Sequence, residues 1–254
     1  MEYVLVRYGE ISLKGKNRSF FEKALVKNII SNLERNSVKY ENVIRLRNRI
    51  LIKTSEDCSC LKKVFGIVSF SPANKVELSL DEIKKEALTL FDKGTFKIFT
   101  KRIDSRVEWR SQKVNEVVGA EVVEKGGVVN LDNPETEIGI DLYNDYAFVF
   151  SEKILGSGGL PVGVEGVVTL ILEDEKSLQA GILMMKRGCN LEIVNGKNIS
   201  FEILKDYLNK IPVVEHPSSN SKAIVLGEEL NEISRRDFEL PIFRPLIGYK
   251  KIIV

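Results

Sequence analysis

Basic side chains gather at three places along the chain where they could neutralise a phosphate backbone. The first place surrounds Gly15, directly before a predicted helix, and holds Lys14, Lys16, Asn17 and Arg18. Free backbone N–H groups at the start of a helix favour phosphate, and nearby cations add to that effect. These four residues are candidate ligands for a nucleic acid, and an ordinary solvated turn is the alternative interpretation.

The second place is an alternating run of arginines. Arg45, Arg47 and Arg49 share one face of a strand if the chain runs straight through Asn48. Arginines two residues apart can follow a sugar–phosphate backbone. We take them as candidate nucleic-acid ligands, and the alternative is a charged sheet face that simply contacts solvent.

The third place follows a predicted strand in the middle of the chain, where Asp104 and Glu108 dilute the positive charge. Trp109 lies inside this cluster and could stack on a base, although a single tryptophan is more often part of a core. The candidate ligands here are Lys101, Arg102, Arg106 and Arg110, with Lys97 and Lys113 beside them.

Charge is distributed unevenly along the chain. The net charge of all 254 residues is +2, but residues 1–70 hold 14 Lys and Arg against 7 Asp and Glu. A basic first quarter suits a polyanionic partner or a solvated face. No uncharged apolar run approaches about 18 residues, and the first residues lack the pattern of a signal peptide, so we expect a cytoplasmic protein with no membrane contact. Three cysteines are too few for a disulfide framework.

The first quarter of the chain reads as strand, helix and strand. Residues 1–7 alternate and include the β-branched Val4 and Val6, which predicts a strand. Ser19, with Glu22 three residues on, predicts a helix that begins with a capping box. Residues 43–53 return to period two and predict one further strand. The apolar stripe of the helix would be Phe21, Leu25, Ile29 and Leu33, and the apolar face of the second strand Ile44, Leu46, Ile50 and Ile52.

Strands and helices continue to alternate over the rest of the chain, which favours layered α/β domains. A turn-rich link at 158–163 separates two such segments. The predicted helices are 80–91, 111–123 and 176–187, the last ended by Gly188, and the predicted strands are 96–102, 138–142, 146–150 and 167–172. The fold class is therefore α/β, or α+β, with a ferredoxin-like first domain and domain limits at 1–70, 71–165 and 166–254.

The opening from Val6 to Arg18, followed by Phe20 and Phe21, resembles the start of the ThiI-type tRNA 4-thiouridine sulfurtransferases. Phe65-Gly66-Ile67 is similar to the junction into their THUMP domain. Four further stretches are similar to that domain as far as its end, at 96–102, 118–119, 129–134 and 156–163. The resemblance implies a THUMP RNA-binding domain at 71–165 that, with the first domain, binds the acceptor stem and single-stranded 3′ end of tRNA.

The same family continues with a PP-loop ATP pyrophosphatase domain, marked by Ser-Gly-Gly-x-Asp-Ser before a helix that ends in Met-Met-Lys-Arg-Gly. That helix end is present at 184–188, which places the loop at 172–177 and leaves only Ser177 of its signature. Glycines let backbone N–H groups approach a pyrophosphate, whereas carboxylates at 4 Å repel it by roughly 1 kcal/mol each in water. We expect 166–254 to be a shortened, degenerate, Rossmann-like PP-loop remnant that binds no ATP. The altered positions are Glu173, Asp174, Glu175, Lys176 and Ser177.

No residue of this sequence is a good candidate for catalysis or for a metal. The catalytic cysteine region of the family lies beyond the position of Gly248 and is expected to be missing. Cys189 follows a helix C-terminus, where the dipole disfavours a thiolate. Cys58 and Cys60 have no second ligand pair for zinc, and His216 is the single histidine.

These observations predict a cytoplasmic tRNA-binding protein that acts in tRNA modification without being catalytic on its own. It would need no cofactor, because ATP is expected only for intact members of the family. Its partners would be tRNA, a separate tRNA-modifying enzyme and, as full-length relatives imply, a second copy in a homodimer. Two alternatives stay open: a divergent sulfurtransferase component whose partner chain supplies the ATP and cysteine chemistry, and a structural or dimerisation module.

Overall fold

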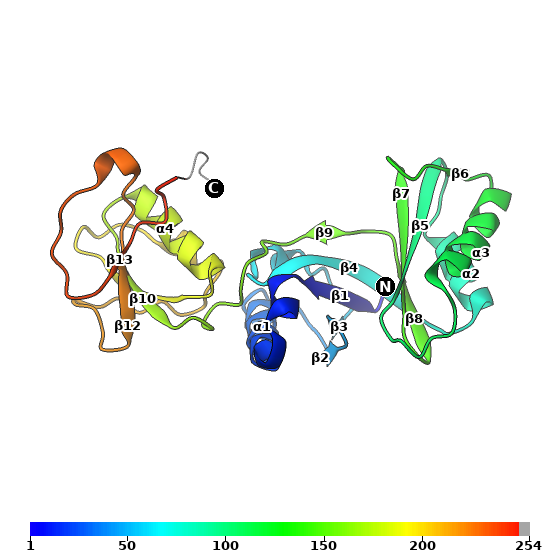
Figure 1. Ribbon diagram of the computed structural model, residues 1–254, viewed down its shortest axis with the longest axis horizontal. Helices are drawn as coiled ribbons and strands as arrows, with labels where there is room; N and C mark the ends of the chain where they lie inside the picture. The colour runs from blue at the N-terminus through cyan, green and yellow to red at the C-terminus, as the bar shows by residue number, and fades with distance from the viewer. Residues whose placement is uncertain (249–254) are drawn as a thin grey trace. The chain divides into compact units, whose positions relative to one another are not determined.

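Strands dominate the first of the two units into which the chain divides. The computed structural model describes residues 1–248, and this unit comprises Met1–Arg7, Lys39–Cys58 and Ser69–Leu155. Its strands follow the order β2-β3-β1-β4-β8-β7-β5-β6, with β9 paired to β4 (Figure 1). Their bounds are β1 (Tyr3–Tyr8), β2 (Asn42–Leu46), β3 (Arg49–Lys53), β4 (Ile67–Glu77), β5 (Thr95–Arg102), β6 (Val128–Val129), β7 (Thr136–Leu142), β8 (Tyr146–Phe150) and β9 (Ile154–Leu155).

The single strand predicted over 43–53 is wrong, because β2 and β3 form a tight hairpin. Leu46 pairs with Arg49, and Arg47 and Asn48 make the turn between them. Asn48 has a φ of +60°, which asparagine tolerates better than most residues and which suits a two-residue hairpin turn. Residues that pair directly across two antiparallel strands share a face, so the reversal puts Arg45 and Arg49 on opposite faces.

Two helices cover the core of the remaining strands in this unit. They are α2 (Leu80–Thr89) and α3 (Ser111–Glu124). The acidic residues Asp81 and Glu82 lie in the first turn of α2, where they complement the helix dipole. Trp109 packs partly buried against this core, which favours the core interpretation over base stacking. The core includes Ile83, Ala87, Val114, Val118, Val122, Ile138 and Ile140. The helices and strands predicted for this part of the chain are confirmed within a few residues.

Within the described residues, the second unit comprises Tyr8–Val38, Ser59–Val68 and residues 156–248. Two 3-10 helices, η1 (Glu10–Leu13) and η2 (Gly15–Asn17), lead into α1 (Arg18–Arg35), and η3 is Ser59–Lys63. The predicted capping box is wrong, because these turns run directly into α1 and the N-cap residue Asn17 already has helical backbone. Every member of the predicted apolar stripe is buried, namely Phe21, Leu25, Ile29 and Leu33.

A parallel sheet with strand order β11-β10-β12-β13 forms the C-terminal part of this unit (Figure 1). The helix α4 (Glu175–Lys186) connects β10 to β11, and Gly188, with φ +95°, lies just beyond its end. Leu170, Ala180, Met185 and Leu191 bury the apolar face of α4 against the sheet. The remaining bounds are β10 (Val167–Ile171), β11 (Asn190–Val194), α5 (Glu202–Lys205), β12 (Ser221–Val225), η4 (Leu230–Glu232) and β13 (Ile242–Phe243). The strand and helix predicted here, and their Rossmann-like parallel arrangement, are confirmed.

Polar contacts join α1 to the C-terminal part of the same unit. The Asn28 amide donates to the Val162 carbonyl at 3.1 Å. The Arg35 guanidinium donates to the Lys205 carbonyl at 2.7 Å and to Asn209 Oδ1 at 2.8 Å. The second unit thus combines residues of the predicted first domain with residues of the predicted third. The division at 1–70, 71–165 and 166–254 stays a prediction.

Candidate functional site

Lys14 and Lys16 lie in the turns before α1, where neither makes an ion pair with any residue that the structure describes. Lys16 is exposed, and the Lys14 Nζ lies 4.7 Å from the centre of the Phe21 ring. Gly15 between them has a φ of +50°, which glycine adopts without strain. Both ammonium groups are therefore available to an anion.

Arg18 is bonded within the protein, unlike the two lysines. Its Nε donates to Glu22 Oε1 at 2.7 Å and its Nη2 to the Tyr8 hydroxyl at 2.8 Å. Burial, with the hydrogen bond to Glu22, raises the pKa of Tyr8 to about 12, so the phenol keeps its proton. Asn17 is exposed at the N-cap position. Arg18 fixes the start of α1, and its role as an RNA ligand stays a prediction.

The predicted arginine stripe is wrong, since the hairpin separates its members. Arg45 and Arg47 are exposed, but Arg49 is only 8% exposed. The Arg49 Nε donates to Asp141 Oδ2 on β7 at 2.8 Å. The Arg49 side chain is therefore not at the surface. Of the three arginines, Arg45 and Arg47 remain candidate nucleic-acid ligands.

A buried polar cluster surrounds Asp141, and sequence reasoning missed it. The Arg7 Nη1 donates to the Ser71 hydroxyl at 2.9 Å, and its guanidinium lies 4.5 Å from the centre of the Phe150 ring. Burial lowers the pKa of Arg7 to about 10. Burial also raises the pKa of Tyr143, and the Asp141 charge adds to that effect. Arg7 on β1 and Asp141 on β7 are 134 residues apart in sequence, so no local pattern predicts that their charges interact.

In the third basic cluster, some cations are bonded within the protein and others are exposed to solvent. Arg106 donates to Asp104 at 2.6 Å, and these hydrogen bonds lower the pKa of Asp104 to about 2. The Arg102 Nη1 donates to the Val107 carbonyl at 3.3 Å. Lys101 and Arg110 are exposed and make no ion pair within residues 1–248. The last two are the stronger candidates of this cluster.

The altered loop, residues 172–177, follows β10 and runs into the first turn of α4. This is the position expected from the helix end at 184–188. Asp174 is the N-cap of α4, and its Oδ1 accepts from the Ser177 backbone N–H and from the Ser177 hydroxyl, both at 2.9 Å. The Ser177 hydroxyl accepts from the Glu173 backbone N–H at 3.2 Å. Two N–H groups of the kind that would contact a phosphate are thus bonded within the loop.

One acidic side chain of this loop, Glu173, is paired with a cation, which corrects part of the electrostatic prediction. Arg236 donates to both carboxylate oxygens of Glu173, at 2.9 Å and 2.8 Å. Lys176 donates to Glu232 at 2.5 Å and lies 3.5 Å from Glu229. Arg236 therefore offsets part of the repulsion that Glu173 would exert on a phosphate, whereas Lys176 is already paired with carboxylates from outside the loop.

Backbone and ion pairs cover the first turn of α4. A Cβ added to Gly227 would lie 2.5 Å from the Ser177 backbone nitrogen, so the chain passes directly against the helix end. Glu228 accepts from the Ser234 hydroxyl at 2.6 Å and from the Arg244 Nε at 2.7 Å. Burial opposes ionisation of Glu228, but these hydrogen bonds outweigh it and hold its pKa below its ordinary value. The backbone donors and the space at this helix end are therefore taken up by groups of the protein itself.

The cysteines and the histidine belong to no metal-binding group of three in the described part of the chain. Cys189 is buried, and burial raises the pKa of its thiol, which disfavours a nucleophilic thiolate. Among residues 1–248, no group of three His, Cys, Asp or Glu is placed to hold a metal ion. None of the helices described there is long and apolar enough to cross a membrane.

Comparisons with known proteins agree with this architecture. Residues 3–71 match the ThiI ferredoxin-like domain and residues 77–152 match the THUMP domain. A probable tRNA sulfurtransferase of Thermoanaerobacter sp. (strain X514) is 31% identical over 98% of this chain and 83% of its own. One from Methanocaldococcus jannaschii is 36% identical over 92% of this chain and 68% of its own. The chain belongs to the ThiI-type tRNA sulfurtransferase family.

Two solved structures resemble the fold. PH1313 from Pyrococcus horikoshii superposes with a TM-score of 0.87 at 31% identity, over 99% of this chain and 96% of its own. A 4-thiouridine synthetase was solved in complex with RNA and with bound ATP. It superposes with a TM-score of 0.78 at 23% identity, over 98% of this chain and 82% of its own. The ferredoxin-like and THUMP architecture is therefore shared across these proteins.

Proposed function

We propose that this chain binds tRNA in the course of tRNA modification. The observation that carries the proposal is the pairing of a ThiI ferredoxin-like domain with a THUMP domain over residues 3–152. A 4-thiouridine synthetase of the same fold was solved with RNA bound, which supports RNA as the ligand. The protein would act in the cytoplasm, on the acceptor stem and 3′ end of tRNA.

Exposed cations supply the charge that such an interaction needs. Lys14, Lys16 and Arg47 are accessible in the ferredoxin-like part, and Lys101 and Arg110 in the THUMP part, none with an ion pair to a described residue. Each phosphate that a protein neutralises releases counterions, so affinity for tRNA falls as salt rises. Phosphate contacts of this kind position a nucleic acid without reading its sequence.

Replacing Lys14 and Lys16 with Ala should weaken tRNA binding uniformly across tRNA sequences. The slope of log K against log salt should decrease by roughly 0.7–0.9 for each lost phosphate contact. Filter binding or fluorescence anisotropy at several salt concentrations measures the slope. The matched control replaces Lys197 and Lys210, two exposed lysines elsewhere in the second unit, and makes the same change in net charge. Equal slopes of log K against log salt for the two double variants would contradict these phosphate contacts. The turn before α1 would then be an ordinary solvated turn.

We further propose that the C-terminal part supplies no ATP chemistry on its own. Its loop donors are bonded internally and Gly227 lies against the helix end. Tight phosphate binding needs such donors free. Even if the Ser177 hydroxyl left its partners in the loop, it would contribute only about 1 kcal/mol, whereas millimolar affinity requires about 4 kcal/mol. Isothermal titration of the whole chain with ATP and magnesium should show no saturable heat. Micromolar binding would contradict this and would favour an enzymatic role.

A second candidate function is that of a divergent sulfurtransferase component. Membership of a family of tRNA sulfurtransferases favours it. In that case a separate chain would supply the ATP chemistry and a reactive cysteine, while this chain presents the RNA. Formation of 4-thiouridine only when both chains are mixed would support that role. Homodimer formation stays a prediction, and analytical ultracentrifugation of the chain tests it.

A further inference from the structure

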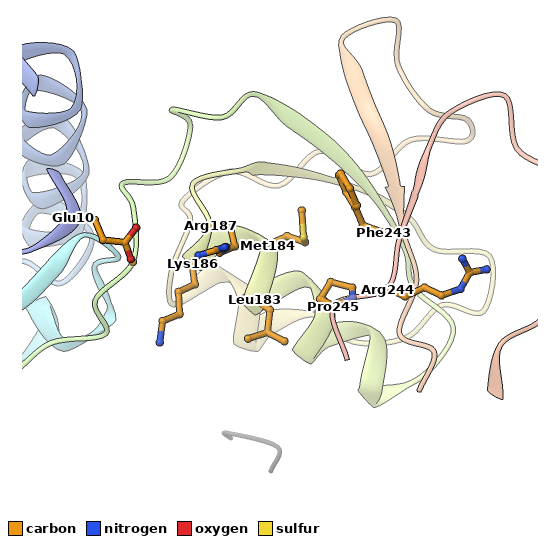
Figure 2. Close-up of a pocket in the computed structure, with 9 residues that line it drawn as sticks. Glu10, Leu183, Met184, Lys186, Arg187, Phe243, Arg244 and Pro245 are labelled. Carbon is orange, nitrogen blue, oxygen red and sulfur yellow. The ribbon is translucent and has the colours of Figure 1, made fainter. Parts of the chain in front are cut away.

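A cavity of about 650 Å³ lies in the second unit beside the C-terminal half of α4 (Figure 2). It is distinct from the altered loop, which lies at the N-terminal end of the same helix. Its volume falls in the range of sites that hold small ligands, about 300–1,000 Å³. Its lining comes from α4, from the strand β13 and the residues after it, from the link before β10 and from η1.

The walls of this cavity are apolar and include an accessible aromatic ring. Leu183 and Met184 contribute from α4, and Phe243 and Pro245 come from β13 and the residues after it. Phe243 is 46% exposed, although the strand that carries it is held by pairing with Val225 on β12. A rigidly held, half-exposed aromatic ring is the kind of surface on which a nucleic-acid base stacks.

The free charges at the cavity are mainly positive. Lys186 and Arg187 make no ion pair with any residue in 1–248. Arg244 is already bonded to Glu228 at 2.7 Å, and Figure 2 shows its side chain directed away from Lys186. Glu10 supplies the one carboxylate of the lining. Two unpaired cations beside apolar walls suit a ligand with a flat apolar part and an anionic part.

The backbone around the cavity is tightly fixed. Gly159 has a φ of +76°, and a Cβ there would lie 2.3 Å from the Lys186 carbonyl oxygen. The next residue, Leu160, donates its N–H to that same oxygen at 2.9 Å. The link is therefore clamped to the C-terminus of α4, so the cavity is formed before a ligand arrives.

We propose that this cavity receives an unpaired nucleotide of a bound RNA, with the base stacked on Phe243 and a phosphate near Lys186 and Arg187. The inference rests on the proposed function. A polynucleotide is favoured over an acidic peptide because a base has a flat face that can stack on the half-exposed Phe243 ring. In addition, Glu10 in the lining lies only four residues before Lys14, the first cation of the basic turn in the same unit. A single RNA strand could therefore contact both the cavity and the basic turn.

The test uses the full chain and two RNA hairpins that differ only in a short single-stranded extension. Phe243→Ala should weaken binding of the extended hairpin by about fivefold or more, the effect of one lost base stack, and should leave blunt-hairpin binding unchanged. Replacing Lys186 and Arg187 with Ala should reduce the salt dependence for the extended hairpin only. Leu230→Ala is the control, because Leu230 is 71% exposed in the same unit and does not line the cavity.

A Phe243→Trp variant provides a direct readout at the cavity. Its fluorescence should be quenched by the extended hairpin and not by the blunt one. Equal effects of Phe243→Ala on both hairpins, or no effect on either, would overturn the inference while leaving RNA binding intact. Quenching by free adenosine monophosphate that matches the extended hairpin would assign the cavity to a mononucleotide instead. If the wild-type chain binds neither hairpin at low salt, the proposed function itself fails.

Discussion

The Arg49 side chain shows what a buried charge does in the first unit. Its Nε contacts Asp141 Oδ2 at 2.8 Å, and the two side chains are 10% and 1% exposed. A buried pair contributes little net stability compared with apolar residues, yet loss of one partner leaves the other charged and unpaired. Arg49 therefore acts on the folded state and not on a ligand.

Arg49→Ala should destabilise the first unit by about 3–5 kcal/mol, because Asp141 would then be buried without its partner. Urea unfolding followed by circular dichroism measures the change. Lys53→Ala is the control, since Lys53 and Glu41 form an exposed pair at 2.7 Å on the same hairpin, and exposed pairs contribute little. A midpoint shift no larger for Arg49→Ala than for Lys53→Ala would show that Asp141 tolerates the loss of its partner.

At the scale of the element, close backbone approach holds the start of α4. Gly227→Ala would place a Cβ 2.5 Å from the Ser177 nitrogen, and relieving such a clash costs about 1–3 kcal/mol. Gly196→Ala is a matched change, because no atom lies within 4 Å of a Cβ at that position. Thermal unfolding should show a lower midpoint for the first variant and an almost unchanged midpoint for the second. The opposite order would mean that the loop moves away freely.

The same region should lose stability in acid through Glu228. Its pKa lies below the ordinary value of 4.5, so the folded state favours the charged form. The stabilisation is therefore fully present above the unfolded pKa and is lost as pH falls through the folded one. Unfolding of the wild type should become easier between about pH 5 and pH 3, and Glu228→Gln should show a smaller acid dependence. If the stability of the wild type and of Glu228→Gln fell equally with pH, Glu228 would be excluded as the cause of the acid dependence.

Elements with a strong local signal could be predicted from sequence, and elements joined at long range could not. The helix at 111–123 has apolar residues at helical spacing, and α3 agrees within a residue. The hairpin was missed because two short alternating strands on either side of Asn48 look like one longer strand. Arg236 and Glu173 are 63 residues apart, so their pairing follows from the fold and not from a local pattern. The cavity at Phe243 was missed for the same reason.

At the scale of the whole molecule, α1 belongs with the C-terminal part of the chain. Arg35→Ala should speed hydrogen exchange in both α1 and residues 202–209 by about fivefold or more, since charge-assisted hydrogen bonds contribute about 1.5–3 kcal/mol. Exchange in α2 and α3, which belong to the first unit, should stay unchanged. Exchange that rises in α1 alone would show that the two segments open independently. Tests of RNA binding should accordingly use the full chain.

This arrangement sets an order of events during synthesis on the ribosome. Arg35 and Lys205 are 170 residues apart, so at about 5–20 residues per second the end of α1 waits roughly 10–30 s for its partner. Phe65 likewise waits for Tyr207, on which its ring stacks at 4.9 Å. The first unit is complete once Leu155 has emerged. A nascent chain that stalls before residue 205 would therefore carry one finished unit and one in which Phe65 lacks its stacking partner Tyr207, and such an incomplete core is a surface that a chaperone would recognise.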